Sequence, residues 1–140
     1  MVLVDLDDFK AVNDELGHAA GDDTLREVAQ LMVQQSRADD IMARYGGDEF
    51  AILLVETPKS GASCYAERIC QALADCAFSH ARQSQITASF GIASLPEDSL
   101  VSSEALIRAA DEALYAAKRE GKNSVASYEP ETTCWPPSLA

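Results

Sequence analysis

Apolar and polar residues follow one another along the start of the chain in patterns that predict one strand and two helices. Residues 2–6 form a short apolar run ending among acids, which predicts a buried strand with carboxylates at its carboxyl end. Residues 9–16 predict a short helix that ends at Gly17. After Gly21 the apolar positions recur every three or four residues, which predicts an amphipathic helix over residues 21–36.

The middle of the chain predicts a hairpin and a further helix. Apolar runs over residues 40–45 and 49–55 flank a Gly-Gly-Asp-Glu sequence that begins at position 46. A Gly-Gly pair between two apolar runs is typical of a β-hairpin, because glycine accepts the positive φ of tight turns. The two acids are therefore expected at a hairpin tip. Residues 59–77 carry one apolar face and predict a helix.

The last third completes an α+β arrangement. Residues 86–92 alternate between apolar and polar, the period of a half-buried strand. Ser102 is a suitable N-cap for a helix that runs to about residue 119, and residues 124–128 are expected to close the sheet. Strands joined both by a hairpin and by helices predict a mixed or antiparallel sheet flanked by helices. One domain is expected over residues 1–128, with a flexible tail over residues 129–140, rich in Pro, Thr and Ser.

Charge and composition exclude several classes of protein. The 140 residues include 11 basic and 23 acidic side chains, which gives a net charge of −12. Nucleic-acid binding needs a basic stripe, so a nucleic-acid partner is not expected. No apolar run has the length of a membrane span, so no membrane partner is expected of this chain either. A phosphate ligand would need positive charge supplied locally.

The four cysteines do not resemble a metal site. Cys64, Cys70 and Cys76 are spaced six apart, which places them on different faces of a helix, and Cys134 stands alone. Free thiols are expected, and they fit a reducing cytoplasm.

Two acidic clusters, at residues 5–8 and at residues 48–49, fall at strand ends or turns. If their strands are neighbours the clusters converge, and two or three carboxylates suit a hard divalent cation such as Mg²⁺. The alternative is a solvated acidic rim, which spacing alone does not exclude.

The sequence over residues 44–50, Arg-Tyr-Gly-Gly-Asp-Glu-Phe, resembles the signature of the GGDEF family of diguanylate cyclase domains. Three other stretches resemble that family with its spacing. They are D-L-D-D-F-K from Asp5, N-D through G-H to G-D from Asn13 to Asp22, and A-L-Y-A-A-K through G-K-N from Ala113 to Asn123. The resemblance implies a nucleotidyl-cyclase-like, palm-like α+β fold with a mostly antiparallel sheet flanked by helices.

The resemblance implies an enzyme that condenses two GTP into cyclic di-GMP with release of two pyrophosphates, using Mg²⁺ or Mn²⁺ in a homodimer. By motif position it implies roles for eleven residues: the metal ligands Asp5, Leu6 (through its carbonyl) and Asp48, the catalytic acids Asp48 and Glu49, and the substrate-binding residues Asn13, His18, Asp22, Gly46, Gly47, Lys118 and Lys122. Two alternatives stay open. Asn13 and Asp22 could be a helix cap and a turn residue, and the two lysines could be solvated charges at a helix end.

The family's product-inhibition site has an R-x-x-D sequence shortly before the Gly-Gly pair. Arg37 and Asp40 match it here, and Arg68 could supply a second arginine. An Arg–Asp pair on a surface loop is the alternative. At the position of Lys122, many members of the family have arginine. We expect the contact of Lys122 with phosphate to be weaker, because an ammonium point charge replaces a bidentate guanidinium group.

One departure from the family concerns the start of the chain. A D-x-L-T-x-L-x-N-R-R stretch and a helix usually precede the first strand, whereas Met1 adjoins it here. We therefore expect weaker GTP binding and stability, and upstream sensory domains in a larger cytoplasmic protein. A non-catalytic GGDEF module that binds GTP or cyclic di-GMP is the alternative function, and a cyclase making cyclic AMP or GMP is a more distant one.

Overall fold

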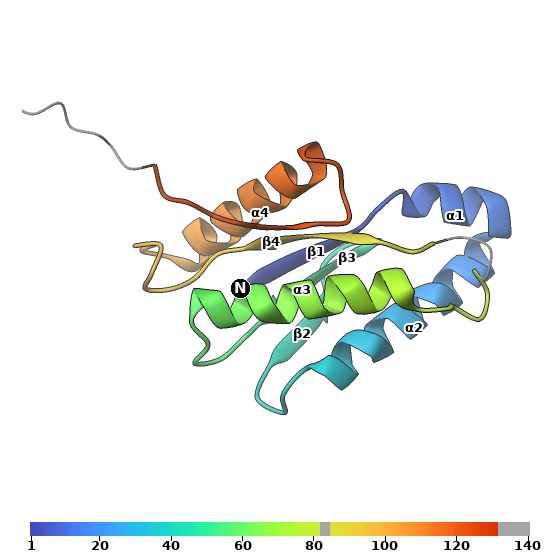
Figure 1. Cartoon of the computed structure of the whole chain (residues 1–140), viewed down its shortest axis with the longest axis horizontal. Helices are drawn as coiled ribbons and strands as arrows, with labels where there is room; N and C mark the ends of the chain where they lie inside the picture. Colours follow the sequence, from blue (N-terminus) through green and yellow to red (C-terminus); the bar gives the residue numbers. More distant parts are fainter. Residues whose placement is uncertain (82–84, 132–140) are drawn as a thin grey trace, which may run out of the picture.

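The computed structural model describes residues 1–81 and 85–131, which build a five-stranded sheet with helices on both faces (Figure 1). The elements follow in the order β1 (Val2–Leu6), α1 (Phe9–Leu16), α2 (His18–Gln35), β2 (Ile41–Arg44), β3 (Glu49–Leu53), α3 (Lys59–Asp75), β4 (Ala88–Ile92), α4 (Ser103–Arg119) and β5 (Val125–Ser127). The strand order is β2-β3-β1-β4-β5, with only the β4–β5 pair parallel. The α+β class with a mostly antiparallel sheet is confirmed.

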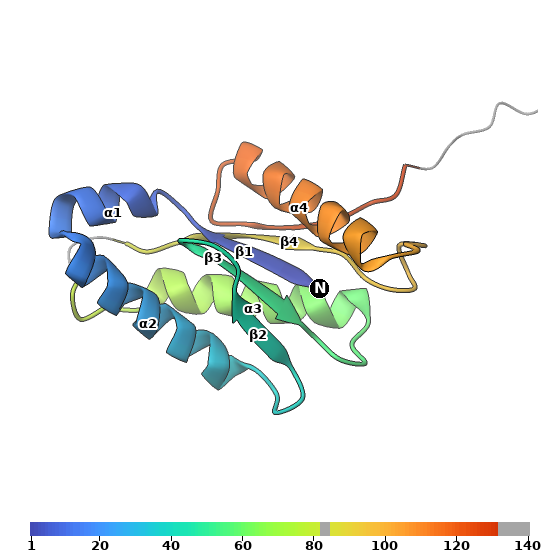
Figure 2. The same cartoon turned by 180° about the vertical axis from the view of Figure 1, so that it is seen from behind.

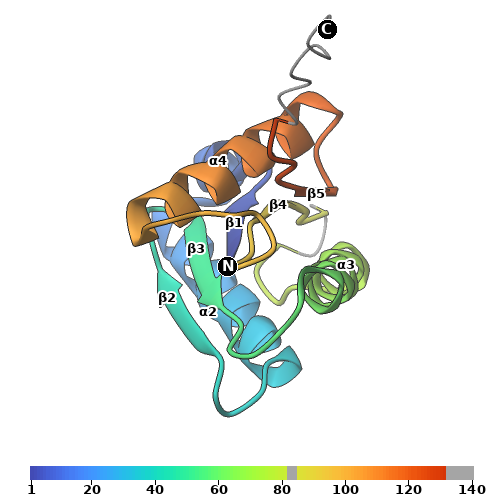
Figure 3. The same cartoon turned by 90° about the vertical axis from the view of Figure 1, so that its left-hand side faces the viewer.

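Strand β1 lies at the centre of the sheet and supplies side chains to two cores. Val2, Val4 and Leu6 point into the larger core, which α2 and α3 cover. Leu3 points to the opposite face, where α4 packs (Figure 3). This alternation places Asp5 on the α4 face of the sheet, where α4 ends.

Helix α4 packs very close to β4. Its N-cap is Ser102, whose hydroxyl accepts from the backbone N–H of Ala105 at 3.0 Å, as the sequence predicts. A Cβ on Gly91 of β4 would lie 2.2 Å from the carbonyl oxygen of Ala110 and 2.3 Å from the nitrogen of Leu114. Glycine therefore sets the distance between α4 and the sheet.

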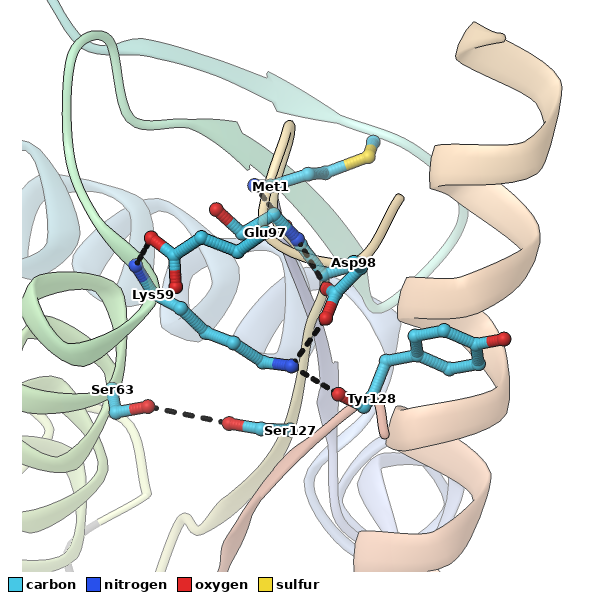
Figure 4. A network of polar contacts seen from close by, with 9 residues as sticks. Met1, Lys59, Ser63, Glu97, Asp98, Ser127 and Tyr128 are labelled. Carbon is cyan, nitrogen blue, oxygen red and sulfur yellow. Dashed lines mark hydrogen bonds and ion pairs between the residues drawn. The ribbon is translucent and has the colours of Figure 1, made fainter. Parts of the chain in front are cut away.

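A polar network stabilises the end of the sheet at which β1 begins. The ammonium of Lys59 donates to Asp98 Oδ1 at 2.5 Å and to the carbonyl of Tyr128. Asp98 is 3% exposed, and its other carboxylate oxygen accepts from the N–H of Ser94 at 2.7 Å. Figure 4 shows these contacts beside the amino group of Met1. One buried ion pair thus joins α3, the loop before α4 and the segment after β5.

Several boundaries differ from the sequence-based expectations. Helix α2 begins at His18 rather than residue 21, because Gly17 with φ of 87° turns the chain between α1 and α2 and both helices abut it. Strand β3 ends at Leu53 and β4 begins at Ala88, although Ile86 is buried as expected.

The structure describes only the first residues of the expected C-terminal tail. Residues 129–131 lie in no helix or strand, and the rest of the expected tail, with Cys134, lies outside the described residues. Cys64, Cys70 and Cys76 are free thiols, as expected. Within residues 1–81 and 85–131, no helix is long and apolar enough to cross a membrane.

Gly91→Ala is expected to destabilise the fold by about 1–3 kcal/mol, because the added methyl group forces α4 away from β4. Denaturant unfolding followed by circular dichroism measures the loss. Gly47→Ala is the control, since a Cβ there has no atom within 4 Å. Equal stability of the two variants would contradict the close packing of α4.

Candidate active site

Three carboxylates meet where β1 ends beside the hairpin between β2 and β3. Asp5 pairs in register with Glu49 across the antiparallel β1–β3 ladder. The backbone N–H of Leu6 donates to the carbonyl of Asp48 at 3.1 Å, which holds the hairpin tip against β1. The two acidic clusters of the sequence therefore converge. Asp5 is only 8% exposed, so it does not belong to a solvated rim.

The hairpin tip is shaped by side chains as well as by its glycines. Arg44 Nη2 donates to the carbonyl of Gly47 at 2.6 Å, and its Nε donates to the carbonyls of Gly46 and Gly47 at 3.1 Å. Neither glycine has a positive φ, so the conformational reason given for them from the sequence is wrong. A Cβ on Gly46 would lie 2.7 Å from Glu49 Oε2. A side chain at position 46 would therefore displace the carboxylate of Glu49 from its present place.

Two lysines from the end of α4 face the acids. Lys118, in the last turn of α4, forms an ion pair with Asp5. Lys122 lies just beyond the helix and pairs with Asp8 at 2.7 Å. Both lysines are thus ion-paired, Lys118 with a buried carboxylate and Lys122 in a pair that stays exposed to solvent. The site therefore holds local positive charge despite the acidic net charge of the chain.

The crowded carboxylates perturb one another. Burial raises the pKa of Asp5, opposed by the hydrogen bond from Lys118, while the negative charge of Asp48 raises it further. Burial also raises the pKa of Glu49, and the charges of Asp5 and Asp48 add to the effect. The site therefore holds more negative charge than Lys118 compensates.

This excess charge fits a divalent cation. Among the described residues, no three His, Cys, Asp or Glu side chains already form a complete metal site. Mg²⁺ does not need one, because it takes one or two carboxylates and completes its shell with water and phosphate oxygens. Asp5 and Asp48 supply carboxylate oxygens and Leu6 a carbonyl oxygen, which is the donor chemistry that Mg²⁺ prefers.

A hollow of about 310 Å³ lies between α2 and the hairpin. Its lining residues are Asp22, Leu25, Arg26, Ala29, Met42, Arg44 and Phe50. The side chain of Asn13 lies against Gly21, the residue before Asp22. A Cβ on Gly21 would be only 1.7 Å from Asn13 Oδ1. Asn13 and Asp22 both lie inside helices, so they are not the cap and turn residue of the alternative interpretation. His18 is exposed at the start of α2 and does not line the hollow.

A second hollow, of about 370 Å³, contains Arg37, Asp40 and Arg68 together. The backbone N–H of Arg37 donates to Asp40 Oδ2 at 2.8 Å, while the ion pairs of the described residues include none between these two side chains. Arg68 Nε donates to Gln35 Oε1 at 2.9 Å and its guanidinium lies 5.6 Å from the centre of the Tyr65 ring. The three residues thus share one concave surface, with Arg68 held from two sides.

Asp7 accepts a set of hydrogen bonds that the sequence pattern does not predict. Its Oδ1 accepts from the hydroxyl of Ser89, and its Oδ2 accepts from the hydroxyl of Thr87, each at 2.7 Å. Oδ2 also accepts from the backbone N–H of Asn123 at 2.8 Å. From the sequence, Asp7 is only one of several acids after the first strand, because its hydrogen-bond partners lie at least 80 positions away along the chain.

A family model and the sequences of known proteins point to the same family. The family model described as "Diguanylate cyclase, GGDEF domain" matches residues 1–124. The chain is 43% identical over 132 residues to "Probable diguanylate cyclase DgcE" of Escherichia coli (strain K12), a match covering 94% of this chain and 12% of that protein. It is 39% identical over 126 residues to "Diguanylate cyclase A" of Treponema denticola, covering 89% and 34% respectively. The chain thus spans about a third or less of these relatives' lengths.

Solved structures share the fold. The GGDEF domain of PA1120 (YfiN or TpbB) from Pseudomonas aeruginosa superposes with a TM-score of 0.83 at 37% identity, covering 91% of this chain and 80% of that one. The GGDEF domain of DgcB from Caulobacter crescentus, solved in complex with c-di-GMP, has a TM-score of 0.81 at 32% identity, covering 91% and 75%.

Asp5→Asn is expected to make the metal-free protein more resistant to heat at neutral pH. Because the pKa of Asp5 is raised on folding, the contribution of its carboxyl group to stability is full below the ordinary value and is lost as pH rises through the raised one. Asparagine avoids this loss, so the melting temperature should rise by a few degrees, roughly the effect of 1 kcal/mol.

Thermal unfolding in EDTA at pH 8 and at pH 4 measures the effect. The difference between variant and wild type should be larger at pH 8. A variant that melts below wild type at pH 8 would show that the Lys118 ion pair outweighs the cost of burying Asp5.

Proposed function

The chain belongs to the GGDEF domain family of diguanylate cyclases, and we propose that it condenses two GTP into cyclic di-GMP and releases two pyrophosphates. The observation that carries this proposal is the convergence of Asp5, Asp48 and Glu49 with Lys118 and Lys122 at one end of the sheet. Acids for a metal and lysines for phosphates are the groups that nucleotidyl transfer needs. We further propose that this chain acts in the cytoplasm as part of a larger sensor protein.

Each bond is formed by attack of a ribose 3′-hydroxyl on an α-phosphorus, with pyrophosphate as the leaving group. Glu49 accepts the proton of the attacking hydroxyl, with Asp48 beside it favouring deprotonation. The raised pKa of Glu49 suits this role because it lies nearer to neutral pH than that of an ordinary carboxyl group. Asp5, Asp48 and the Leu6 carbonyl would hold Mg²⁺ or Mn²⁺, which would supply charge neutralisation at the phosphates. One chain offers one such set of residues, so two chains must face each other and the active form is a homodimer.

The lysines must exchange partners when GTP binds. Lys118 and Lys122 are paired with Asp5 and Asp8, and we propose that they turn to the β- and γ-phosphates once a metal ion neutralises the acids. Gly46 and Gly47 lack a Cβ and therefore allow the triphosphate close to the hairpin backbone. Binding of metal and nucleotide is thus expected to be mutually dependent.

Guanine recognition is assigned to the hollow beside α2. Asp22 lines it, and Asn13 lies next to Gly21, so a carboxylate and an amide can together match the donors and acceptor of guanine. His18 is assigned to the rim of the same region. Adenine presents a mismatched edge to these groups, which favours GTP over ATP.

The second hollow is assigned to product inhibition. Arg37 and Arg68 supply guanidinium groups for phosphate or for stacking on guanine, and Asp40 supplies acceptors for guanine N–H groups. Bound cyclic di-GMP would hold two chains in an arrangement that separates their half-sites. A non-catalytic module that binds cyclic di-GMP through this hollow is the alternative function.

Asp48→Asn is expected to lower cyclic di-GMP formation by at least about 100-fold, the scale of a lost acid–base group. Product is measured by chromatography after incubation with GTP and Mg²⁺, with ATP as the control substrate. Asp75→Asn, on the exposed side of α3, should leave the rate and the circular dichroism spectrum unchanged. A rate above about a tenth of wild type would remove Asp48 from this role, and absence of product from wild type would favour the non-catalytic alternative.

Arg37→Ala is expected to weaken cyclic di-GMP binding at least tenfold, because it removes a charged fork from the second hollow. Calorimetric titration of cyclic di-GMP compares wild type, Arg37→Ala and the control Arg108→Ala, which changes an arginine on α4 outside that hollow. Equal affinity of all three proteins would show that Arg37 and Asp40 form only a surface pair with no role in binding cyclic di-GMP.

A further inference from the structure

The turn after α4 has an unusual backbone. Gly121, Lys122 and Asn123 have φ values of 121°, 64° and 44°, so two non-glycine residues in succession adopt the left-handed region. Such residues cost free energy and persist only where surrounding contacts hold them. This turn carries Lys122, which the proposed function assigns to phosphate binding.

Asp7 ties the turn to the strands, in addition to the backbone bonds by which Gly121 and Lys122 donate to the carbonyls of Lys118 and Ala117. Its Oδ2 accepts from the N–H of Asn123 at 2.8 Å, while the hydroxyls of Thr87 and Ser89 orient the carboxylate from β4 and the residue before it. A second contact comes from α3, where the thiol of buried Cys70 lies 3.4 Å from Asn123 Oδ1. The turn is thereby fixed to β1, β4 and α3.

The same contacts set Asp7 apart from its neighbours in sequence. Asp5 pairs with Lys118 and Asp8 with Lys122, whereas Asp7 accepts three hydrogen bonds from uncharged groups. A carboxylate has about four acceptor positions, so Asp7 has little capacity left for a metal ion. Its chemistry is that of a structural acceptor within an otherwise ionic cluster.

We propose that Asp7 is a positioning residue, which fixes the 121–123 turn and holds Lys122 beside the carboxyl end of β1 for the triphosphate. The proposal rests on the proposed function for its ligand and on the hydrogen bond to Asn123 for its geometry. Asp7 acts through its hydrogen bonds and not through its charge. An amide in its place can keep them, because its oxygen accepts from Thr87 and Asn123 while its NH₂ donates to the hydroxyl of Ser89.

Three variants separate hydrogen bonding from charge. Asp7→Ala removes both, Asp7→Asn removes only the charge, and Asp75→Asn removes an exposed charge on α3. We expect Asp7→Ala to weaken binding of a non-hydrolysable GTP analogue with Mg²⁺ at least tenfold by calorimetry. The two asparagine variants should stay within threefold of wild type.

Amide hydrogen exchange gives a readout that does not depend on nucleotide. The Asn123 amide should exchange at least tenfold faster in Asp7→Ala and at the wild-type rate in the other two variants. If Asp7→Ala does not fold, Asp7→Leu combined with Thr87→Val and Ser89→Ala replaces it, because apolar side chains in place of all three partners leave no buried hydroxyl unpaired.

The outcomes distinguish the inference from the proposed function. Equal damage by Asp7→Asn and Asp7→Ala would assign the effect to charge or to metal binding and overturn the inference. Wild-type affinity in Asp7→Ala would overturn it as well. A wild-type chain that does not bind the analogue would overturn the proposed function, and Asn123 exchange would still decide whether Asp7 holds the turn.

Discussion

The fold is organised around an accumulation of negative charge at the carboxyl end of β1. Asp5, Asp48 and Glu49 are brought together by the β1–β3 ladder, and burial makes the charged forms of Asp5 and Glu49 costly. Their main compensation comes from the end of α4, more than 110 residues from Asp5. The position of α4 is therefore critical, and Gly91 permits it by letting the helix backbone lie directly against β4.

The sheet order explains how distant segments reach one place. Strand β1 is central and is bonded to a neighbour on each side, so Asp5 stands on a rigid part of the molecule. The hairpin brings one group of acids from one side, and α4 brings the lysines from the other. At the opposite end of β1, the buried Lys59–Asp98 pair fixes the loop before α4, so the helix is held at both ends.

Much of this could be predicted from the sequence because it rests on local patterns. Hydrophobic periodicity located the strands and helices, and the family motifs placed Asp48, Lys118 and Asp22 among candidate residues. Periodicity cannot reveal that Gly46 lies against the carboxylate of Glu49 instead of adopting the positive φ of a tight turn. Nor can it reveal Asp7, because Thr87, Ser89 and Asn123 become its neighbours only when β4 and the turn after α4 are in place.

The two hollows share no lining residue, although one strand connects them. Asp40, just before β2, lines the second hollow, and Arg44 at the end of β2 lines the first. Strand β2 is an edge strand bonded only to β3, so a change at one end could be absorbed before reaching the other. For the proposed product inhibition, such geometry favours a change in the relative placement of two chains over distortion within one chain. Under that mechanism, the hollow beside α2 keeps its shape while the second hollow is filled.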